Sequence, residues 1–208
     1  MIITYNALES FKIQLGDTTI ALNPISKRSK LPVTSFGADV AIVSIDHDDM
    51  NGVESVSRGS AAPFVIMGPG EYEVGGVFVR GFSSVSTYGG KERLNTIYTI
   101  ALEDSNLCFL GALGTATLSP ETLGALPDID ILFVPVGGDG VLSPAEASKL
   151  VTSLEPRVII PMHYDAPALA SFLKEEGVSG IAADKLTLRK KEILEKEGEI
   201  ITLKPTAG

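Results

Sequence analysis

The sequence predicts an α/β fold in which two β-sheets pack face to face inside an outer layer of helices. Three observations support this prediction. Short apolar segments separated by turn residues fill the first half of the chain, strands alternate with helices in the second half, and 44% of the 208 residues are hydrophobic, which is enough to bury a sizeable core. We find no compositional break, short-period repeat or low-complexity segment, so we expect one domain over residues 1–208.

The first half reads as a series of short strands. Phe11 to Leu15 alternates with a period of two, Gly16-Asp17 is a turn, and Thr18 to Leu22 returns as the second strand of a hairpin. Ala38 to Ser44 is a continuous apolar run, typical of a strand covered on both faces. Further strands, interpreted as a meander followed by a hairpin, are predicted over 63–67, 71–74, 77–82, 96–102 and 106–111.

The second half alternates helices with strands. Ser119-Pro120 and Ser143-Pro144 each combine an N-cap serine with proline at the first helical position, which predicts helices that reach about Leu126 and Ser153. A third helix is expected from Ala166 to Glu176. Strands are predicted over 131–135, 157–161, 186–188 and 200–203.

The charge balance limits the classes of partner. A formal net charge of -9 repels nucleic acid and anionic lipid at long range, so we expect no nucleic-acid partner and no membrane partner. No apolar run approaches the length of a membrane span and no leader precedes Met1, so we expect a cytoplasmic protein. The single cysteine, Cys108, is expected in a buried strand. The partner is unknown from sequence, and a homo-oligomer is compatible with it.

Only two histidines occur, and each lies in a segment that looks suited to a metal. His47 stands within Ser44 to Asn51, and His163 within Pro161 to Tyr164, each directly after a predicted strand. A dinuclear zinc hydrolase needs imidazole and carboxylate donors from several loops and an open position for water. Two histidines cannot supply that set alone.

The resemblance to a known family rests on several short segments that occur in one order along nearly the whole chain. They are Leu22-Asn23-Pro24, Ala38 to Asn51, Gly68 to Val74, Asn95 to Tyr98, Leu110 to Gly114, Val134 to Gly138 and Ile160 to Tyr164. In this order they resemble the metallo-β-lactamase superfamily, in particular its small bacterial branch related to ascorbate-phosphate lactonase-like Zn-dependent hydrolases. The resemblance implies a four-layer αββα sandwich with two mixed sheets.

The resemblance also implies which positions would hold metal. Three of the family's ligands are kept, at His47, Asp49 and His163. Four other ligand positions have lost their donors, namely Ile45, Met50, Ser86 (placed to within one residue) and Ala112. One metal position would keep a single donor and the other would keep two, whereas a catalytic zinc needs three protein ligands. The bridging carboxylate, which would stand at Ala112, is lost as well.

These departures lead to a hypothesis and to alternatives. We expect a degenerate metal site, no cofactor, and a noncatalytic binding or assembly role, that is, a pseudoenzyme. The first alternative is a metal-dependent hydrolase of phosphoester or lactone substrates that binds one zinc or other divalent cation through His47, Asp49 and His163, with Asp49 as its catalytic residue. The second is a metal-free binder of a small metabolite. Whether the chain is an enzyme is left open, and His47 could instead be a structural loop histidine bonded to neighbouring carboxylates.

Overall fold

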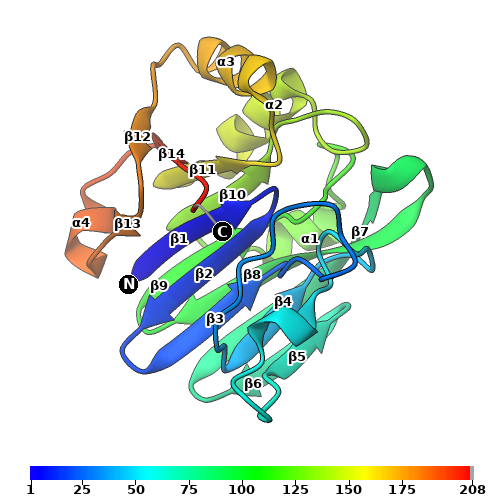
Figure 1. The fold of residues 1–208 in the computed structure, drawn as a ribbon. Helices are drawn as coiled ribbons and strands as arrows, with labels where there is room; N and C mark the ends of the chain where they lie inside the picture. The colour runs from blue at the N-terminus through cyan, green and yellow to red at the C-terminus, as the bar shows by residue number, and fades with distance from the viewer. Residues whose placement is uncertain (207–208) are drawn as a thin grey trace.

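The structure is a computed structural model that describes residues 1–206, and it contains two β-sheets that lie face to face (Figure 1). Both sheets mix parallel with antiparallel pairs. The predicted fold class, an α/β sandwich of two mixed sheets, is therefore confirmed.

The first sheet has six strands in the order β13-β1-β2-β3-β4-β5. Their bounds are β1 Ile2–Ala7, β2 Ser10–Leu15, β3 Thr18–Leu22, β4 Val40–Val43, β5 Phe64–Met67 and β13 Leu186–Thr187. The predicted hairpin is β2 and β3, and the apolar run that begins at Ala38 forms β4, whose four residues are all buried. β4 lies parallel to both β3 and β5, which explains why it is apolar on both faces.

The second sheet has eight strands in the order β12-β14-β11-β10-β9-β8-β7-β6. Their bounds are β6 Gly70–Val74, β7 Val77–Ser86, β8 Arg93–Leu102, β9 Ser105–Phe109, β10 Ile131–Pro135, β11 Val158–Met162, β12 Ile181–Ala183 and β14 Glu199–Leu203. β6 to β9 form an antiparallel meander, and β9, β10, β11 and β14 run parallel.

One predicted pairing is wrong. The strand at 63–67 was interpreted as part of a meander with the two strands after it, but β5 pairs with β4 in the other sheet. Gly68 has a φ of 99° and Gly70 a φ of 150°, backbone conformations that glycine adopts without a steric penalty. The chain therefore leaves the first sheet at Gly68 and enters the second at Gly70.

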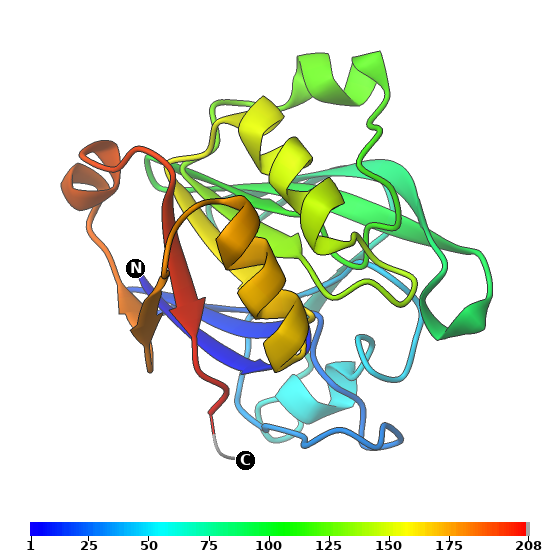
Figure 2. The same cartoon turned by 90° about the horizontal axis from the view of Figure 1, so that it is seen from above.

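Helices cover the outer face of the second sheet, as seen in Figure 2, where α2 and α3 lie side by side over its strands. The bounds are α1 Pro120–Ala125, α2 Pro144–Leu154, α3 Ala166–Glu175 and α4 Lys190–Leu194. Ser119 and Ser143 cap α1 and α2 as predicted, and Ser143 forms a capping box with Glu146. Among residues 1–206, the helix on the outer face of the first sheet is the short 3₁₀ helix Val53–Val56, so the helical layer on that side is thin.

The main core fills the space between the sheets. Phe11 of the first sheet packs edge-on against Phe133 of the second, with 4.9 Å between ring centroids. Each fully buried side chain of this size stabilises the fold by about 1.5–3 kcal/mol. Cys108 is buried on the other face of β9, beneath the helices. This packing fixes the strands, so the segments that leave their carboxyl ends are held at defined positions.

Within residues 1–206, no helix has the length and apolar character that crossing a membrane requires.

Candidate active site

The candidate site lies where several strands end. Asn23 follows β3, Ser44 follows β4 and His163 follows β11. Ligands of α/β sheets bind outside the carboxyl ends of parallel strands, so this edge is where a site is expected. His47 lies on the loop after β4, and the 3₁₀ turn Tyr88–Gly90 at the tip of the β7–β8 hairpin completes the edge.

His163 is held by a buried carboxylate. Its Nδ1 lies 2.5 Å from Oε1 of Glu9, whose side chain has no exposed surface. The backbone of His163 is in the left-handed region at φ 53°, and its amide donates to the carbonyl of Leu8 at 2.7 Å. With Nδ1 occupied, Nε2 is the nitrogen left for another partner, which is the arrangement of metal-binding and catalytic histidines.

Glu9 itself is held by amide and hydroxyl groups. Its Oε2 accepts a hydrogen bond from Nδ2 of Asn23 at 2.8 Å, and that amide also donates to Oγ of Ser44 at 2.9 Å. The amide of Ser44 returns a hydrogen bond to Oδ1 of Asn23 at 2.8 Å. Sequence reasoning missed Glu9, because a charged residue in the turn between β1 and β2 gives no signal of burial.

His47 and Asp49 form a second, more open group. Nδ1 of His47 accepts a hydrogen bond from the amide of Asp49 at 3.2 Å and lies 3.4 Å from Oδ2 of that carboxylate. Oδ1 of Asp49 accepts a hydrogen bond from the hydroxyl of Ser29, and Oδ2 accepts a hydrogen bond from the phenol of Tyr88 at 2.7 Å. The neighbouring Asp48 is engaged elsewhere, with Arg28 at 2.6 Å.

The loop that carries His47 is tied to the loop after β3. The amide of Ser26 donates to the carbonyl of Asp48 at 2.9 Å, and the amide of Gly52 donates to the carbonyl of Pro24 at 2.7 Å. A Cβ at Gly52 would stand 2.1 Å from the carbonyl carbon of Ile25, so the two backbones touch. These contacts hold the two loops together along one side of the site.

Tyr88 stands between the two histidines. Its ring centroid is 4.9 Å from that of His47 and 4.9 Å from that of His163, and both contacts are edge-on. Burial raises the pKa of the Tyr88 phenol above its ordinary value, and the hydrogen bond to Asp49 raises this pKa further. The phenol is therefore neutral at pH 7 and acts as a donor. The sequence did not point to Tyr88, because this residue stands directly before two glycines and looks like part of an exposed turn.

The four positions predicted to have lost donors surround these groups. Ile45, Met50 and Ala112 are buried and form an apolar cluster with Val141, against which Tyr88 packs. Ser86 is also buried. Its hydroxyl accepts a hydrogen bond from the amide of Tyr88 at 3.1 Å and donates to the carbonyl of Gly140 at 3.3 Å. Each of the four residues makes a packing or backbone contact.

The three kept donors do not meet in this arrangement. His47 and Asp49 are neighbours, but the ring of Tyr88 separates them from His163. In the part of the chain that the structure describes, no group of three or more histidine, cysteine, aspartate or glutamate side chains is placed to hold a metal ion. As they stand, these side chains do not fit a three-ligand catalytic zinc.

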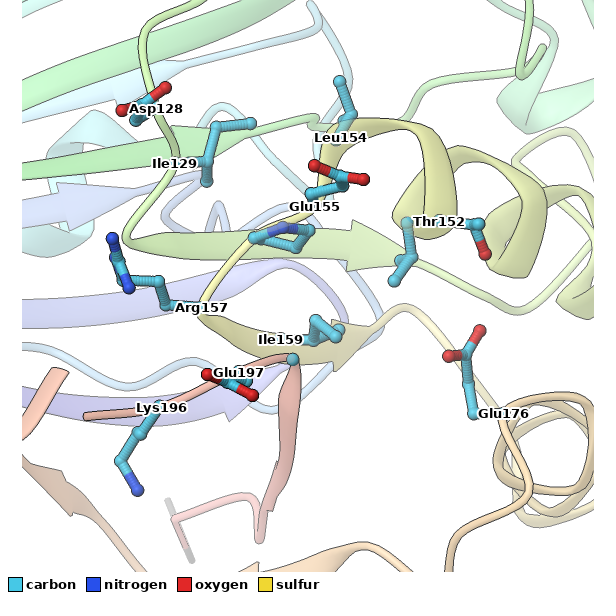
Figure 3. Close-up of a pocket in the computed structure, with 13 residues that line it drawn as sticks. Asp128, Ile129, Thr152, Leu154, Glu155, Arg157, Ile159, Glu176, Lys196 and Glu197 are labelled. Atoms are coloured by element: carbon cyan, nitrogen blue, oxygen red, sulfur yellow. The ribbon is translucent and has the colours of Figure 1, made fainter. Parts of the chain in front are cut away.

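A cavity of about 640 Å³ lies at the other end of β11. Arg157, which precedes that strand, lines it together with charged and apolar side chains, among them Glu176, which points toward its interior in Figure 3. A five-residue strand spans about 17 Å, so this cavity is remote from His163 and has no histidine in its lining. It is not part of the candidate active site.

Relatives of this chain are named as hydrolases. A metal-dependent hydrolase of Listeria monocytogenes is 25% identical in an alignment that covers 86% of this chain and 95% of the relative. A metal-dependent hydrolase of Thermococcus onnurineus is 39% identical over 69 residues, covering 32% and 31% of the two chains. A crystal structure from Thermotoga maritima, described as a Zn-dependent hydrolase of the metallo-β-lactamase superfamily, has a TM-score of 0.78 and 28% identity over 98% of this chain and 99% of that one.

These relatives contradict two expectations drawn from the sequence. We expected a noncatalytic binding or assembly protein, and we expected no cofactor. Proteins similar over most of their length are named metal-dependent hydrolases, so both expectations are wrong. Missing donors at positions such as Ala112 do not by themselves show that activity is lost, and the relatives favour the alternative of a metal-dependent hydrolase.

The family is shown by a match that runs through both sheets. The Beta-lactamase superfamily domain matches residues 2–163, from the start of β1 to His163 at the end of β11. This range contains the whole candidate site. Together with the two mixed sheets and the Thermotoga maritima structure, the match means that this chain belongs to the metallo-β-lactamase superfamily.

Proposed function

We propose that this chain is a metal-dependent hydrolase of small phosphoester or lactone substrates with a reduced, one-ion site. His47, Asp49 and His163 are its candidate ligands, although His163 does not meet the other two in the arrangement described above. The names of its relatives support the reaction class. The observation that carries the proposal is the buried contact between Glu9 and His163 at 2.5 Å.

The contact between Glu9 and His163 is of the kind that orients a metal-binding or catalytic histidine. Burying a carboxylate away from water costs several kcal/mol unless it is paired and hydrogen-bonded. Here Asn23 and His163 provide the partners, and the result is an imidazole fixed in orientation at the carboxyl end of β11. Carboxylates that hold the second nitrogen of a metal-binding histidine set its tautomer and its basicity in this way.

The other residues have roles that follow from their contacts. Asp49 is oriented by Ser29 and by the amide geometry of its own loop, so its carboxylate faces the site rather than solvent. Tyr88 holds its phenolic proton, which it donates to Asp49 in this structure, and it would donate to an anionic substrate oxygen only in place of that bond. A negatively charged phosphoester or the carbonyl oxygen of a lactone would both accept such a bond.

Metal content and turnover test the proposal together. Protein purified without chelator is analysed for zinc, manganese, iron, cobalt and nickel, and is then assayed on p-nitrophenyl phosphate, bis-p-nitrophenyl phosphate and a series of lactones with each metal. We expect metal-stimulated turnover that falls by about 10²-fold or more in His163→Ala and in Asp49→Ala.

A variant outside the candidate site serves as the matched control. Glu176→Gln alters the remote cavity, and its turnover is expected to equal that of the wild type. A wild-type protein that retains no metal and hydrolyses none of these substrates with any added metal would disprove the proposal.

Two sequence expectations stay predictions: a single domain over residues 1–208 and a location in the cytoplasm. Limited proteolysis that leaves one resistant fragment would support the first. Fractionation of the source cells would test the second.

A further inference from the structure

We infer that Arg93 forms a phosphate-binding subsite beside His47, and that this subsite selects phosphoesters over neutral lactones as substrates. The inference rests on the proposed function and deepens it, because it chooses between the two substrate classes named there. A guanidinium binds an oxyanion whether or not a metal is present, so the subsite can be measured in metal-free protein.

Arg93 is the first residue of β8, and its side chain lies beside the loop that carries His47. Its Nη1 donates a hydrogen bond to the backbone carbonyl of Asp46 at 3.1 Å, which holds the guanidinium against that loop. A Cβ at Gly89 would stand 3.1 Å from Nε2 of His47 and 3.9 Å from Nη2 of Arg93. The imidazole and the guanidinium therefore lie next to the same glycine, at the candidate active site.

One edge of this guanidinium has no acceptor. Within residues 1–206, Nε of Arg93 is shielded from water and has no hydrogen-bond partner. Since Nη1 is engaged by Asp46, the edge that is left is the one formed by Nε and Nη2. Arg28 shows what this edge does when a carboxylate faces it, because its Nε and Nη2 donate to Oδ1 of Asp48 at 2.9 and 2.6 Å. An oxyanion of a ligand would engage Arg93 in the same way.

Arg93 also lacks a counter-ion. In the part of the chain that the structure describes, Arg189 is exposed, and four other arginines lie within 3.8 Å of a carboxylate, namely Arg28, Arg58, Arg80 and Arg157. No described carboxylate lies that close to Arg93, which is half-buried. A guanidinium stays charged at pH 7, and a partly buried charge without an opposite partner destabilises the fold. An anionic ligand would offset that cost.

The surroundings of Arg93 explain why it would decide the substrate class. Asp46, Asp48 and Asp49 stand on the neighbouring loop, and their charges repel an anion that approaches this edge of the sandwich. An anionic substrate therefore depends on the guanidinium more than it would at a neutral site. A phosphoester is negatively charged at pH 7, whereas a simple lactone is neutral, so Arg93 favours the phosphoester.

Binding of inorganic phosphate to the metal-free protein tests the subsite, followed by a ³¹P NMR titration. Arg93→Gln removes the charge and keeps a side chain of similar reach, and Arg93→Lys keeps the charge but loses the paired donors. We expect phosphate affinity to fall at least about tenfold in Arg93→Gln, with Arg93→Lys between this variant and the wild type.

Lys91→Gln is the matched control, because Lys91 is exposed in the same turn and its replacement removes the same charge. In about 0.1 M salt this variant should bind phosphate within about twofold of the wild type, since the charge of an exposed side chain is screened. Circular dichroism establishes that each variant is folded, and if Arg93→Gln is not, Arg93→Lys decides.

Turnover gives a second measurement that a merely structural role of Arg93 would not reproduce. With the metal that best stimulates the wild type, kcat/KM for p-nitrophenyl phosphate should fall at least about tenfold in Arg93→Gln. For γ-butyrolactone, which carries no charge, kcat/KM should change by less than about twofold. An equal fall for both substrates would mean that Arg93 supports the fold of the site and does not select the substrate.

The outcomes separate the subsite from the proposed function. If the wild type binds no phosphate, or if Arg93→Gln binds it as tightly as the wild type, the subsite is wrong, and metal-stimulated turnover would still support the proposed function. If phosphate binds through Arg93 but no substrate is hydrolysed with any metal, the proposed function and the selection of substrates fail together, while the phosphate subsite stands.

Discussion

The side chains of Glu9 and Asn23 are matched, because the carboxylate of Glu9 needs donors on both oxygens and the amide of Asn23 supplies one. Oε1 of Glu9 faces His163 at 2.5 Å, and Oε2 accepts from Nδ2 of Asn23 at 2.8 Å. An aspartate here would place a second carboxylate against Glu9 in a buried site.

Asn23→Asp should therefore lower the free energy of unfolding by about 2 kcal/mol or more at pH 7, since it replaces a hydrogen bond with repulsion between buried charges. Glu9→Gln should cost about 1–3 kcal/mol, since its amide would meet the amide of Asn23. The double variant again pairs one donor with one acceptor. Its loss of unfolding free energy should therefore be smaller than the sum of the two single losses by about 1 kcal/mol or more. Urea denaturation measures all four proteins, and strictly additive losses would contradict the matched pair.

Returning a family ligand to Ala112 should destabilise the protein. Ala112 is fully buried in an apolar cluster beside Ile45 and Met50, so Ala112→Asp would place a charge there without an opposite partner. We expect a loss of about 3 kcal/mol or more in metal-free protein. Ala182→Asp on the exposed edge strand β12 is the control, with a change within about 0.5 kcal/mol. An Ala112→Asp variant as stable as the wild type would show that water reaches the side chain at position 112.

Stability should decline at alkaline pH through Tyr98. Burial raises the pKa of this phenol to about 12, above its ordinary 10.0, while its hydroxyl donates to the carbonyl of Val43 at 2.9 Å. A raised pKa in the folded state means that the contribution is complete below pH 10 and is lost as the pH rises from 10 to 12. Unfolding free energies measured across this range should fall less steeply in Tyr98→Phe than in the wild type, and equal slopes would contradict this assignment.

Cys108 should be inert in the folded protein. Burial raises the pKa of its thiol to about 12, and the side chain has no exposed surface. Because the thiolate is the reactive form, we expect Ellman's reagent at pH 8 to react at least ~10³-fold more slowly with native protein than with protein in guanidinium. One thiol per chain should react after unfolding, and rapid reaction with native protein would place Cys108 outside the core.

Most strands and helices were predictable because their signals are local. The serine-proline starts of α1 and α2 and the apolar run of β10 were read at nearly their observed bounds. β1 was not predicted, since no turn precedes it to mark its start, and α4 was missed because Lys190–Leu194 is short and mostly charged. The sheet to which β5 belongs depends on long-range pairing, which local pattern does not specify.

The candidate site was predictable only in part. The resemblance placed His47, Asp49 and His163 at one edge of the sandwich, and the structure puts the first two side by side. Neither Glu9 nor Tyr88 could be found from the sequence, because each lies in a turn whose residues read as exposed. Their importance comes from distant segments that fold against them, as the contacts of Glu9 with His163 and of Tyr88 with Asp49 show.

The backbone contacts that join the loop of Gly52 to the loop of Pro24 close that side of the site. A molecule arriving from that side would have to separate two main chains that already touch, which requires local unfolding. Any ligand of this edge of the sandwich therefore approaches by a route other than the seam between these two loops.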